Sequence, residues 1–260
     1  MQQIKKIDFK ISEFDLIKKY PTNLYYIGDT NLLEKRKISI VGSRSPNQYA
    51  RYIISQISSK LSQVGVCIVS GGAMGIDAIA HQNAGYENTI MIAGTGLDKR
   101  YPAVNKNIIQ NIEEKGLVLS QFEAGVPSHR WNFPLRNKLV VALGEVLIVG
   151  YSDIDSGTMR SVEYALKMNK EIYVIPHRIG DSDGTNKLLA DGKAKAIYNI
   201  DEFVGKFGNN VQTDNKDDFL DYCKTNPTYD EAVSKYGGKI FEYELMGNIE
   251  IKDGRITIVS

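Results

Sequence analysis

The sequence predicts an α/β protein with an extended Rossmann-like, doubly wound parallel sheet and a small C-terminal winged-helix-like module. Short β-branched runs alternate with helical patterns from residue 38 to about residue 208, which is typical of a parallel sheet with helical crossovers. The runs are continuously apolar, which indicates strands covered on both faces. The expected strands are 38–42, 66–70, 89–94, 117–120, 145–150, 171–176 and 195–199.

The segments between and around these strands set the expected domain boundaries. Apolar residues between the first two strands recur at helical spacing and end at Gly65, so a helix is expected there. The tail contains three short helical patterns and a hairpin with Asp253-Gly254 at its turn. We therefore expect a short N-terminal segment suited to covering a sheet edge, a Rossmann-like domain, a polar linker and the winged-helix-like module, over residues 1–37, 38–208, 209–217 and 218–260.

Composition narrows the possible partners. The chain has 260 residues, 42% of them hydrophobic, which suits one α/β domain with a small appendage. Its 32 basic and 31 acidic residues nearly cancel, so nucleic-acid binding would have to come from local placement of cations. Cys67 and Cys223 have no metal or disulfide spacing, and neither a membrane-length apolar run nor a signal-peptide core is present. We expect a cytoplasmic protein with no membrane partner.

Small residues gather at the strand-to-helix junctions, at 42–44, 70–75, 94–96 and 156–158. Backbone N–H groups at helix N-termini attract anions, and small residues let a phosphate approach them. All these junctions fall at the carboxyl edge of the predicted sheet, where ligands bind in such folds. The pattern predicts a ligand with several phosphates, contacted by Ser43, Arg44, Ser70, Gly71, Gly72, Gly157 and Thr158.

Two further features of these loops have alternative interpretations. Asp77 follows the 70–75 loop and is expected to be its structural partner, because a free carboxylate would repel a polyanion. Asn186 and Lys187, in the 183–194 stretch, either line the rim of the phosphate site or belong only to a turn.

The segment 128–143 interleaves cations with aromatic rings: His129, Arg130, Trp131, Phe133, Arg136 and Lys138. This pattern is typical of a single-strand platform, in which cations hold the backbone and rings stack on unpaired bases. The pattern favours base contact for Phe133. For Trp131, base contact and a core position both stay open.

Known enzyme signatures are missing from the chain. No two of its three histidines have ligand spacing, and neither a Gly-x-Ser-x-Gly elbow nor a P-loop occurs. No metal, cofactor or catalytic residue is therefore expected. The main rival is a nucleotide phosphoribohydrolase of the lysine-decarboxylase-like group, with the signature Pro-Gly-Gly-x-Gly-Thr-x-x-Glu. Here the nearest string, at 155–158, lacks the glycine pair, and Glu163 comes later than the signature requires.

The ordered motifs IVGSR, SGGAMGIDAIAH, GTGLDKRYPAVN, FPLRNK, SGTM and GTNKLLADGKA resemble the DNA-processing protein A family (DprA, also called Smf). The resemblance covers roughly residues 20–205. It implies an extended Rossmann core and a homodimer that binds single-stranded DNA and loads RecA onto incoming DNA during natural transformation. The chain would then be a recombination mediator and not an enzyme.

The resemblance also implies roles for individual residues. Arg44 looks like the family's phosphate-binding arginine, and Ser70 to Gly72 resemble its backbone phosphate cradle. Arg130 and Phe133 are similar to its basic and base-stacking residues. They are followed by Arg136, Asn137 and Lys138, the last where the family often has arginine.

The chain departs from the family pattern at two strand ends and in its tail. It has Val149-Gly150-Tyr151 where many members read Val-Glu-Ala, and Pro176-His177 where many read Pro-Gly. The third helix of the tail sets Lys239 against Glu242 and Glu244, whereas a helix that reads DNA is basic. We therefore expect the tail to contact protein or to bind duplex DNA only weakly.

Overall fold

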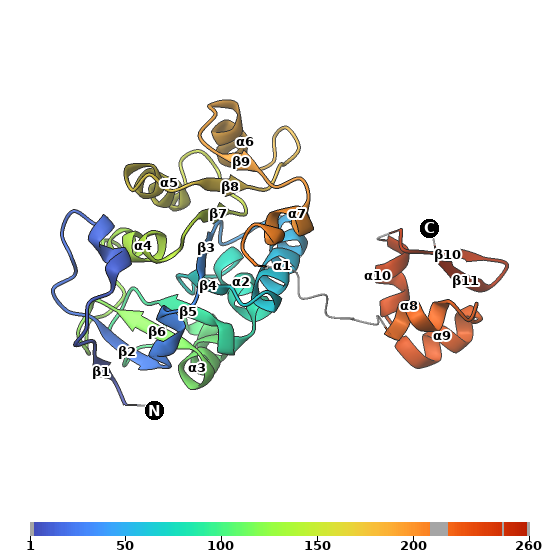
Figure 1. Cartoon of the computed structure of the whole chain (residues 1–260), viewed down its shortest axis with the longest axis horizontal. Coiled ribbons are helices and arrows are strands. Elements are labelled where there is room, and N and C mark those ends of the chain that lie inside the picture. The colour runs from blue at the N-terminus through green and yellow to red at the C-terminus, as the bar shows by residue number, and fades with distance from the viewer. Residues whose placement is uncertain (1–2, 209–217, 246, 259–260) are drawn as a thin grey trace. The chain divides into compact units, whose positions relative to one another are not determined.

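The computed structural model describes residues 3–208, 218–245 and 247–258, and the chain divides into two compact units, Met1–Asn210 and Val211–Ser260 (Figure 1). The predicted linker, 209–217, lies outside the described residues.

The first unit is built on one mixed sheet, which has nine strands within the described residues, in the order β1-β2-β6-β5-β4-β3-β7-β8-β9. From β6 to β9 all neighbours are parallel, which confirms the predicted doubly wound α/β fold class. The strands are β1 (Lys5–Lys6), β2 (Tyr25–Gly28), β3 (Lys37–Val41), β4 (Cys67–Ser70), β5 (Thr89–Ile92), β6 (Leu117–Ser120), β7 (Leu147–Val149), β8 (Ile172–Val174) and β9 (Lys195–Ala196).

The N-terminal segment adds two antiparallel strands that the sequence analysis did not predict. β2 pairs with β6, with Tyr25 opposite Ser120, and β1 pairs with β2. These strands are short, and β2 ends at Gly28, whose φ is 103°. Their apolar sequence pattern is therefore weaker than that of the buried parallel strands. The segment between them packs onto the core through Phe14, which is fully buried on the 3-10 helix η1 (Ser12–Leu16).

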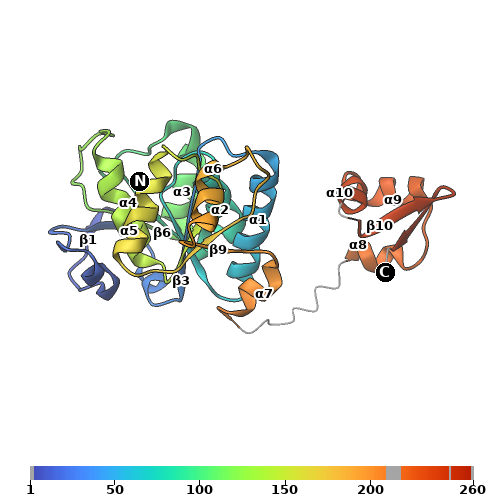
Figure 2. The same ribbon diagram turned by 90° about the horizontal axis from the view of Figure 1, so that it is seen from above.

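Helices cover both faces of the sheet (Figure 2). Helices α1, α2, α3 and α7 pack on one face, whereas α4, α5 and α6 pack on the other. Within the described ranges, no helix is long and apolar enough to cross a membrane. The helices of this unit are α1 (Gln48–Gln63), α2 (Ile76–Ala84), α3 (Lys106–Lys115), α4 (Asn132–Leu143), α5 (Gly157–Lys167), α6 (Asp183–Ala190) and α7 (Ile200–Gly205), with short 3-10 turns η2 (Thr30–Leu33), η3 (Tyr86–Asn88) and η4 (Ala103–Asn105).

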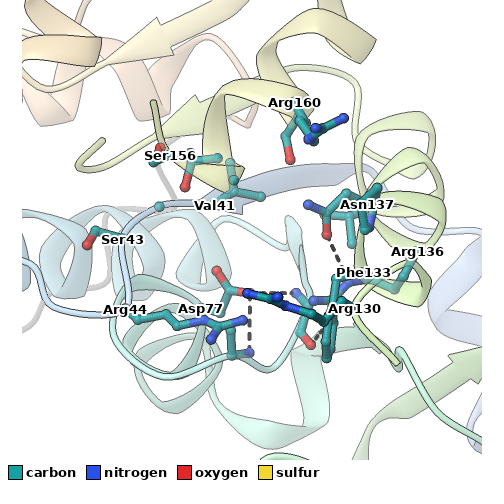
Figure 3. Close-up of a pocket in the computed structure, with 18 residues that line it drawn as sticks. Val41, Ser43, Arg44, Asp77, Arg130, Phe133, Arg136, Asn137, Ser156 and Arg160 are labelled. Atoms are coloured by element: carbon teal, nitrogen blue, oxygen red, sulfur yellow. Dashed lines mark hydrogen bonds between the residues drawn. The ribbon is translucent and has the colours of Figure 1, made fainter. Parts of the chain in front are cut away.

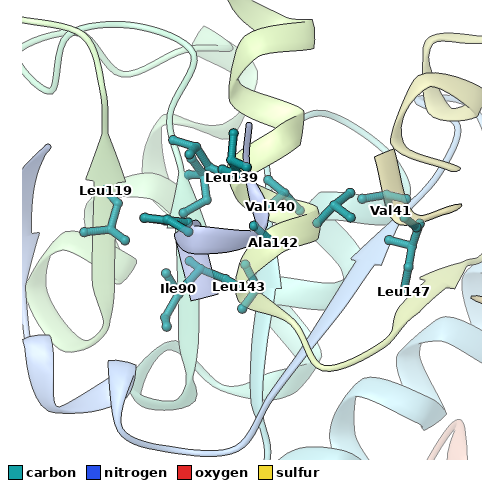
Figure 4. Packing of buried hydrophobic residues seen from close by; sticks show 14 of the residues in the cluster. Val41, Ile90, Leu119, Leu139, Val140, Ala142, Leu143 and Leu147 are labelled. Carbon is teal, nitrogen blue, oxygen red and sulfur yellow. The ribbon is translucent and has the colours of Figure 1, made fainter. Parts of the chain in front are cut away.

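Helix α4 is packed on several sides. It connects β6 to β7 and so crosses the face of the strands between them, where Leu139, Val140 and Leu143 pack on strand residues such as Ile90 and Leu147 (Figure 4). It also contacts η1 and α5. Fixed on several sides, its C-terminal half holds its first turn rigidly at the carboxyl edge of the sheet.

The second unit has three short helices followed by a two-stranded hairpin, α8 (Asp218–Cys223), α9 (Tyr229–Tyr236), α10 (Lys239–Leu245), β10 (Ile249–Lys252) and β11 (Arg255–Ile258). Its own core includes Phe219, Ala232 and Ile256. The expected turn is present: Asp253 and Gly254 both have positive φ, 50° and 71°, as a tight hairpin requires. Its assignment as a winged helix stays a prediction.

Candidate functional site

A cavity of about 430 Å³ opens at the carboxyl edge of the sheet, between β3 and β7 (Figure 3). From β3 the parallel sheet continues in chain order through β4 and β5 on one side and through β7 and β8 on the other. Loops on the two sides therefore diverge, which leaves a crevice at the point of reversal. The cavity is lined by the loops after β3, β4 and β7 and by the first turn of α4. This is the edge on which the sequence placed a phosphate ligand.

Three guanidinium groups line the cavity. Arg44 follows β3, Arg130 precedes α4, and Arg160 lies in the first half of α5. All are exposed, and no hydrogen-bond or ion-pair partner is found for their side chains within the described residues. A guanidinium stays charged at any ordinary pH and offers five N–H donors. The cavity therefore presents unpaired positive charge to an anion.

The side chain of Phe133 forms one wall of the cavity. It is half-buried, and its ring centroid lies 5.9 Å from Cζ of Arg44 and 5.7 Å from the centroid of Tyr101. The neighbouring Asn132 fixes this turn of α4 by donating from Nδ2 to the carbonyl of Gly94 at 3.0 Å. At Gly94 a Cβ would lie 3.0 Å from the Phe133 ring, so glycine leaves room for it. An aromatic ring beside cations suits a planar, phosphate-bearing ligand.

The floor of the cavity holds two buried residues of opposite charge, Asp77 and Arg136. Arg136 is 5% exposed and donates to the carbonyls of Gly71 and Ile92, the latter at 2.8 Å. Asp77 accepts from the backbone N–H groups of Gly71 and Ala73 at 3.2 and 3.3 Å. Burial raises the pKa of Asp77 and lowers that of Arg136, and each charge opposes the other's shift. The predicted structural role of Asp77 is confirmed.

This floor changes the interpretation of the 70–75 loop. The N–H group of Gly71, which was predicted to cradle a phosphate, donates to Asp77 instead, as does that of the neighbouring Ala73. Ser70 is fully buried and donates its hydroxyl to the carbonyl of Ile40 at 2.6 Å, and Gly72 packs under Met91. Neither Ser70 nor Gly72 lines the cavity. The loop supports the floor, and its small residues allow close packing.

The N-terminus of α5 supplies backbone donors on the opposite wall. Ser156 is the N-cap residue, but its hydroxyl bonds to that of Ser152 at 2.7 Å and caps no backbone N–H. The N–H groups of the first turn, at Gly157 and Thr158, thus remain for an anion at the positive end of the helix dipole. Arg160, which the sequence analysis did not single out, lies three residues beyond Gly157 and so on the same face. The three-residue spacing from Gly157 is the sequence signal that could have identified Arg160 as a site residue.

The remaining predicted residues divide between the cavity and other surroundings. Ser43, Gly71 and Asn137 line it, and Oδ1 of Asn137 accepts from Nε of Arg136 at 3.0 Å. Lys138 does not line it, since its Nζ lies over the ring of Tyr164, 5.9 Å from the centroid.

The 183–194 stretch does not reach the cavity. Nδ2 of Asn186 donates to the carbonyls of Arg178 and Asp181 at 3.1 and 3.0 Å. Lys187 pairs with Asp191 at 3.3 Å. Of the two interpretations left open, the structure favours turn chemistry.

Trp131 is not a core residue. Its side chain is 65% exposed, and its ring stacks on that of His129 with centroids 4.4 Å apart and planes 10° from parallel. The core interpretation is therefore wrong.

Among the described residues, no three His, Cys, Asp or Glu side chains gather in a way that could hold a metal ion.

His81 lies buried on α2 and leads to a prediction of pH-dependent stability. Its Nδ1 bonds to Oγ1 of Thr89 at 2.6 Å, Nε2 has no partner within the described structure, and burial lowers its pKa from 6.5 to about 3. Between those values the unfolded chain binds a proton that the folded chain does not. Stability should therefore fall as pH drops through this window, by up to about 1.4 kcal/mol per pH unit.

The test is urea denaturation of wild type and His81→Gln at a series of pH values, followed by circular dichroism. Glutamine does not titrate, so the variant should show a flatter dependence between about pH 6 and pH 4.5. The raised pKa of Asp77 works in the opposite direction but is present in both proteins. Equal slopes would show that protonation of His81 is not coupled to folding.

Comparison with known proteins adds independent information. A family model described as DNA recombination-mediator protein A matches residues 9–208. The chain is 34% identical over 193 residues to DNA processing protein DprA of Streptococcus pneumoniae, with 72% of this chain and 67% of that protein covered. It is 32% identical over 196 residues to Protein Smf of Synechocystis, with 72% and 49% covered. The matched part thus spans about half to two thirds of these relatives.

Solved structures agree with these matches. DNA processing protein A from Helicobacter pylori, studied for its single-stranded DNA binding mode, aligns with a TM-score of 0.77 and 39% identity, over 79% of this chain and 95% of that one. The crystal structure of DprA from Streptococcus pneumoniae aligns with a TM-score of 0.73 and 31% identity, over 79% and 74%.

Proposed function

This chain belongs to the DNA recombination-mediator protein A family, and on that premise we propose that it binds single-stranded DNA in the cavity between β3 and β7. The observation that carries the proposal is the set of unpaired guanidinium groups of Arg44, Arg130 and Arg160 around the half-buried ring of Phe133. A relative from Helicobacter pylori, 39% identical, is described as binding single-stranded DNA.

In this proposal each part of the cavity has a separate task. Arg44, Arg130 and Arg160 hold phosphates, together with the N–H groups of Gly157 and Thr158 at the start of α5. Phe133 stacks on one unpaired base. Ser43 and Asn137 offer polar groups at the wall. Because these contacts go to the backbone and to a base face, binding depends little on sequence.

The biological role that we propose follows from the family resemblance. The protein acts in the cytoplasm as a recombination mediator and not as an enzyme: it protects incoming DNA and loads RecA on it during natural transformation. A homodimer would place two such cavities on one strand, and the second contact would then form at high effective concentration.

Binding of labelled oligonucleotides, followed by fluorescence anisotropy across a range of salt concentrations, tests the proposal. We expect the full chain to prefer a single strand to a duplex of the same length, because Phe133 can reach only an unpaired base. The logarithm of the binding constant should fall linearly with the logarithm of the salt concentration, and each phosphate contact should add about 0.7 to the steepness of that line.

Two results would contradict the proposal. Tighter binding to duplex would mean that the cavity is not the main contact. Absence of binding to either form would direct attention to the rival nucleotide phosphoribohydrolase, which an assay for release of base from nucleoside monophosphates would examine.

A further inference from the structure

The chain has one tryptophan, and it is held in an unusual position for so large an apolar side chain. Trp131 is 65% exposed at the N-cap of α4, and the imidazole of His129 lies parallel to its ring with centroids 4.4 Å apart. Burial of apolar area therefore does not explain the residue. With one face covered by His129, the exposed area has to include the other face of the indole.

The neighbours of Trp131 connect it to the cavity. Arg130 and Phe133, on either side of it in the chain, both line the cavity, whereas Trp131 and His129 do not. Arg130 is exposed, without a counter-ion in the described part of the chain. The stacked pair thus begins where the cavity wall ends, with an unpaired positive charge between it and Phe133.

We propose that Trp131, backed by His129, is a second base-stacking subsite, which receives the base next to the one that Phe133 holds. The inference rests on the proposed binding of single-stranded DNA and specifies where the strand leaves the cavity. Arg130 then faces the phosphate that joins the two nucleotides.

Two physical arguments favour a nucleobase as the occupant. A flat ring that stacks on a second flat ring offers a planar surface, and every base has a face that fits it regardless of sequence. The contact with His129 also limits the rotation of the indole before binding, which reduces the conformational entropy lost when a base arrives. The adjoining charge of Arg130 matches a phosphate and would disfavour a basic or purely apolar partner.

Tryptophan fluorescence provides a direct test, because the single tryptophan reports on this subsite alone. We expect a single-stranded oligothymidylate to quench the emission, with a midpoint equal to that measured by anisotropy with the same oligonucleotide. A strand of the same length made of abasic nucleotides should bind through its phosphates but leave the emission nearly unchanged. Binding of oligothymidylate without any change in emission would overturn the inference.

Substitution gives a second, independent test. Trp131→Ala should weaken binding of the oligothymidylate about 5- to 150-fold, which corresponds to about 1–3 kcal/mol for one base–aromatic stack. The loss should largely disappear on the abasic strand and on a mononucleotide, which occupies only the cavity. Trp131→Phe should retain most of the affinity, and His129→Ala should lose less than Trp131→Ala.

A matched control is available at the far end of the sheet order. Tyr198, which follows β9, is 86% exposed, so Tyr198→Ala removes an exposed ring elsewhere and should leave binding unchanged.

If the wild type binds no single strand, the proposed function fails. If it binds and Trp131→Ala matches the control, only the second subsite fails. Loss of self-association in Trp131→Ala, with unchanged DNA binding, would assign the ring to contact between copies instead.

Discussion

Replacing Arg44 and Arg130 together by alanine is expected to weaken binding to single-stranded DNA by roughly 10²- to 10⁴-fold at low salt. Both side chains line the cavity, exposed and without a partner in the described structure. Each is expected to make a charge-assisted contact with a phosphate, of about 1.5–3 kcal/mol. The salt slope should also fall by about 1.4, since about 0.7 is lost per phosphate contact on a single strand.

Anisotropy titrations at several salt concentrations, on strands of different sequence, measure both quantities. The loss should be similar for every sequence, because phosphates are shared by all of them. Lys115→Ala with Lys167→Ala is the matched control: both lysines are exposed and lie in the last turns of α3 and α5, just before β6 and β8. It removes the same charge from the amino edge of the sheet. A sequence-selective loss, or an equal loss in the control, would contradict the assignment.

Arg136→Met is expected to lower the free energy of unfolding by about 3–5 kcal/mol. The guanidinium is 5% exposed and bonds to the carbonyls of Gly71 and Ile92. Its removal leaves the buried Asp77 without the nearby charge that favours its ionised form, and an uncompensated buried charge is costly. Urea denaturation followed by circular dichroism gives the change in stability.

Two further variants make this test specific. Arg130→Met removes an exposed guanidinium from the same cavity and should change stability by less than about 0.5 kcal/mol. Adding Asp77→Asn to Arg136→Met removes the uncompensated charge, so the double variant should lose less than the sum of the two single losses. A strictly additive result would show that the two buried charges do not interact.

The sequence was sufficient for the parallel part of the fold. Buried parallel strands are continuous apolar runs, and these were found at each of β3 to β8 with differences of a few residues at the ends. The last predicted strand, 195–199, is present only as the two residues of β9, which are not buried. The antiparallel β1 and β2 were missed, since β1 has only two residues, Lys5 and Lys6, and both are exposed. Their pairing depends on backbone groups at the edge of β6 that no parallel strand uses. This is a tertiary feature, which leaves no pattern in the local sequence.

For the site, the sequence identified the correct edge of the sheet but not how each donor is used. The N–H groups of Gly71 and Ala73 donate to Asp77, and the side-chain amide of Asn186 donates to nearby carbonyls. Composition and spacing show that such groups exist, but their partners are decided by side chains brought together on folding. Exposed residues such as Arg44 and Arg130 have no competing partner in the described structure, and both line the cavity at the predicted edge of the sheet. Their contact with DNA stays a prediction.

The use of Asp77 to satisfy the loop after β4 has a consequence for how a bound strand can move. A rigid cradle of backbone N–H groups would fix one phosphate at one point. Here two N–H groups of that loop already donate to Asp77, so in the proposed complex a phosphate would be held largely by long guanidinium side chains, which can follow it by changing rotamer. We expect such a strand to advance one nucleotide at a time without leaving the protein, and so to be passed on end first.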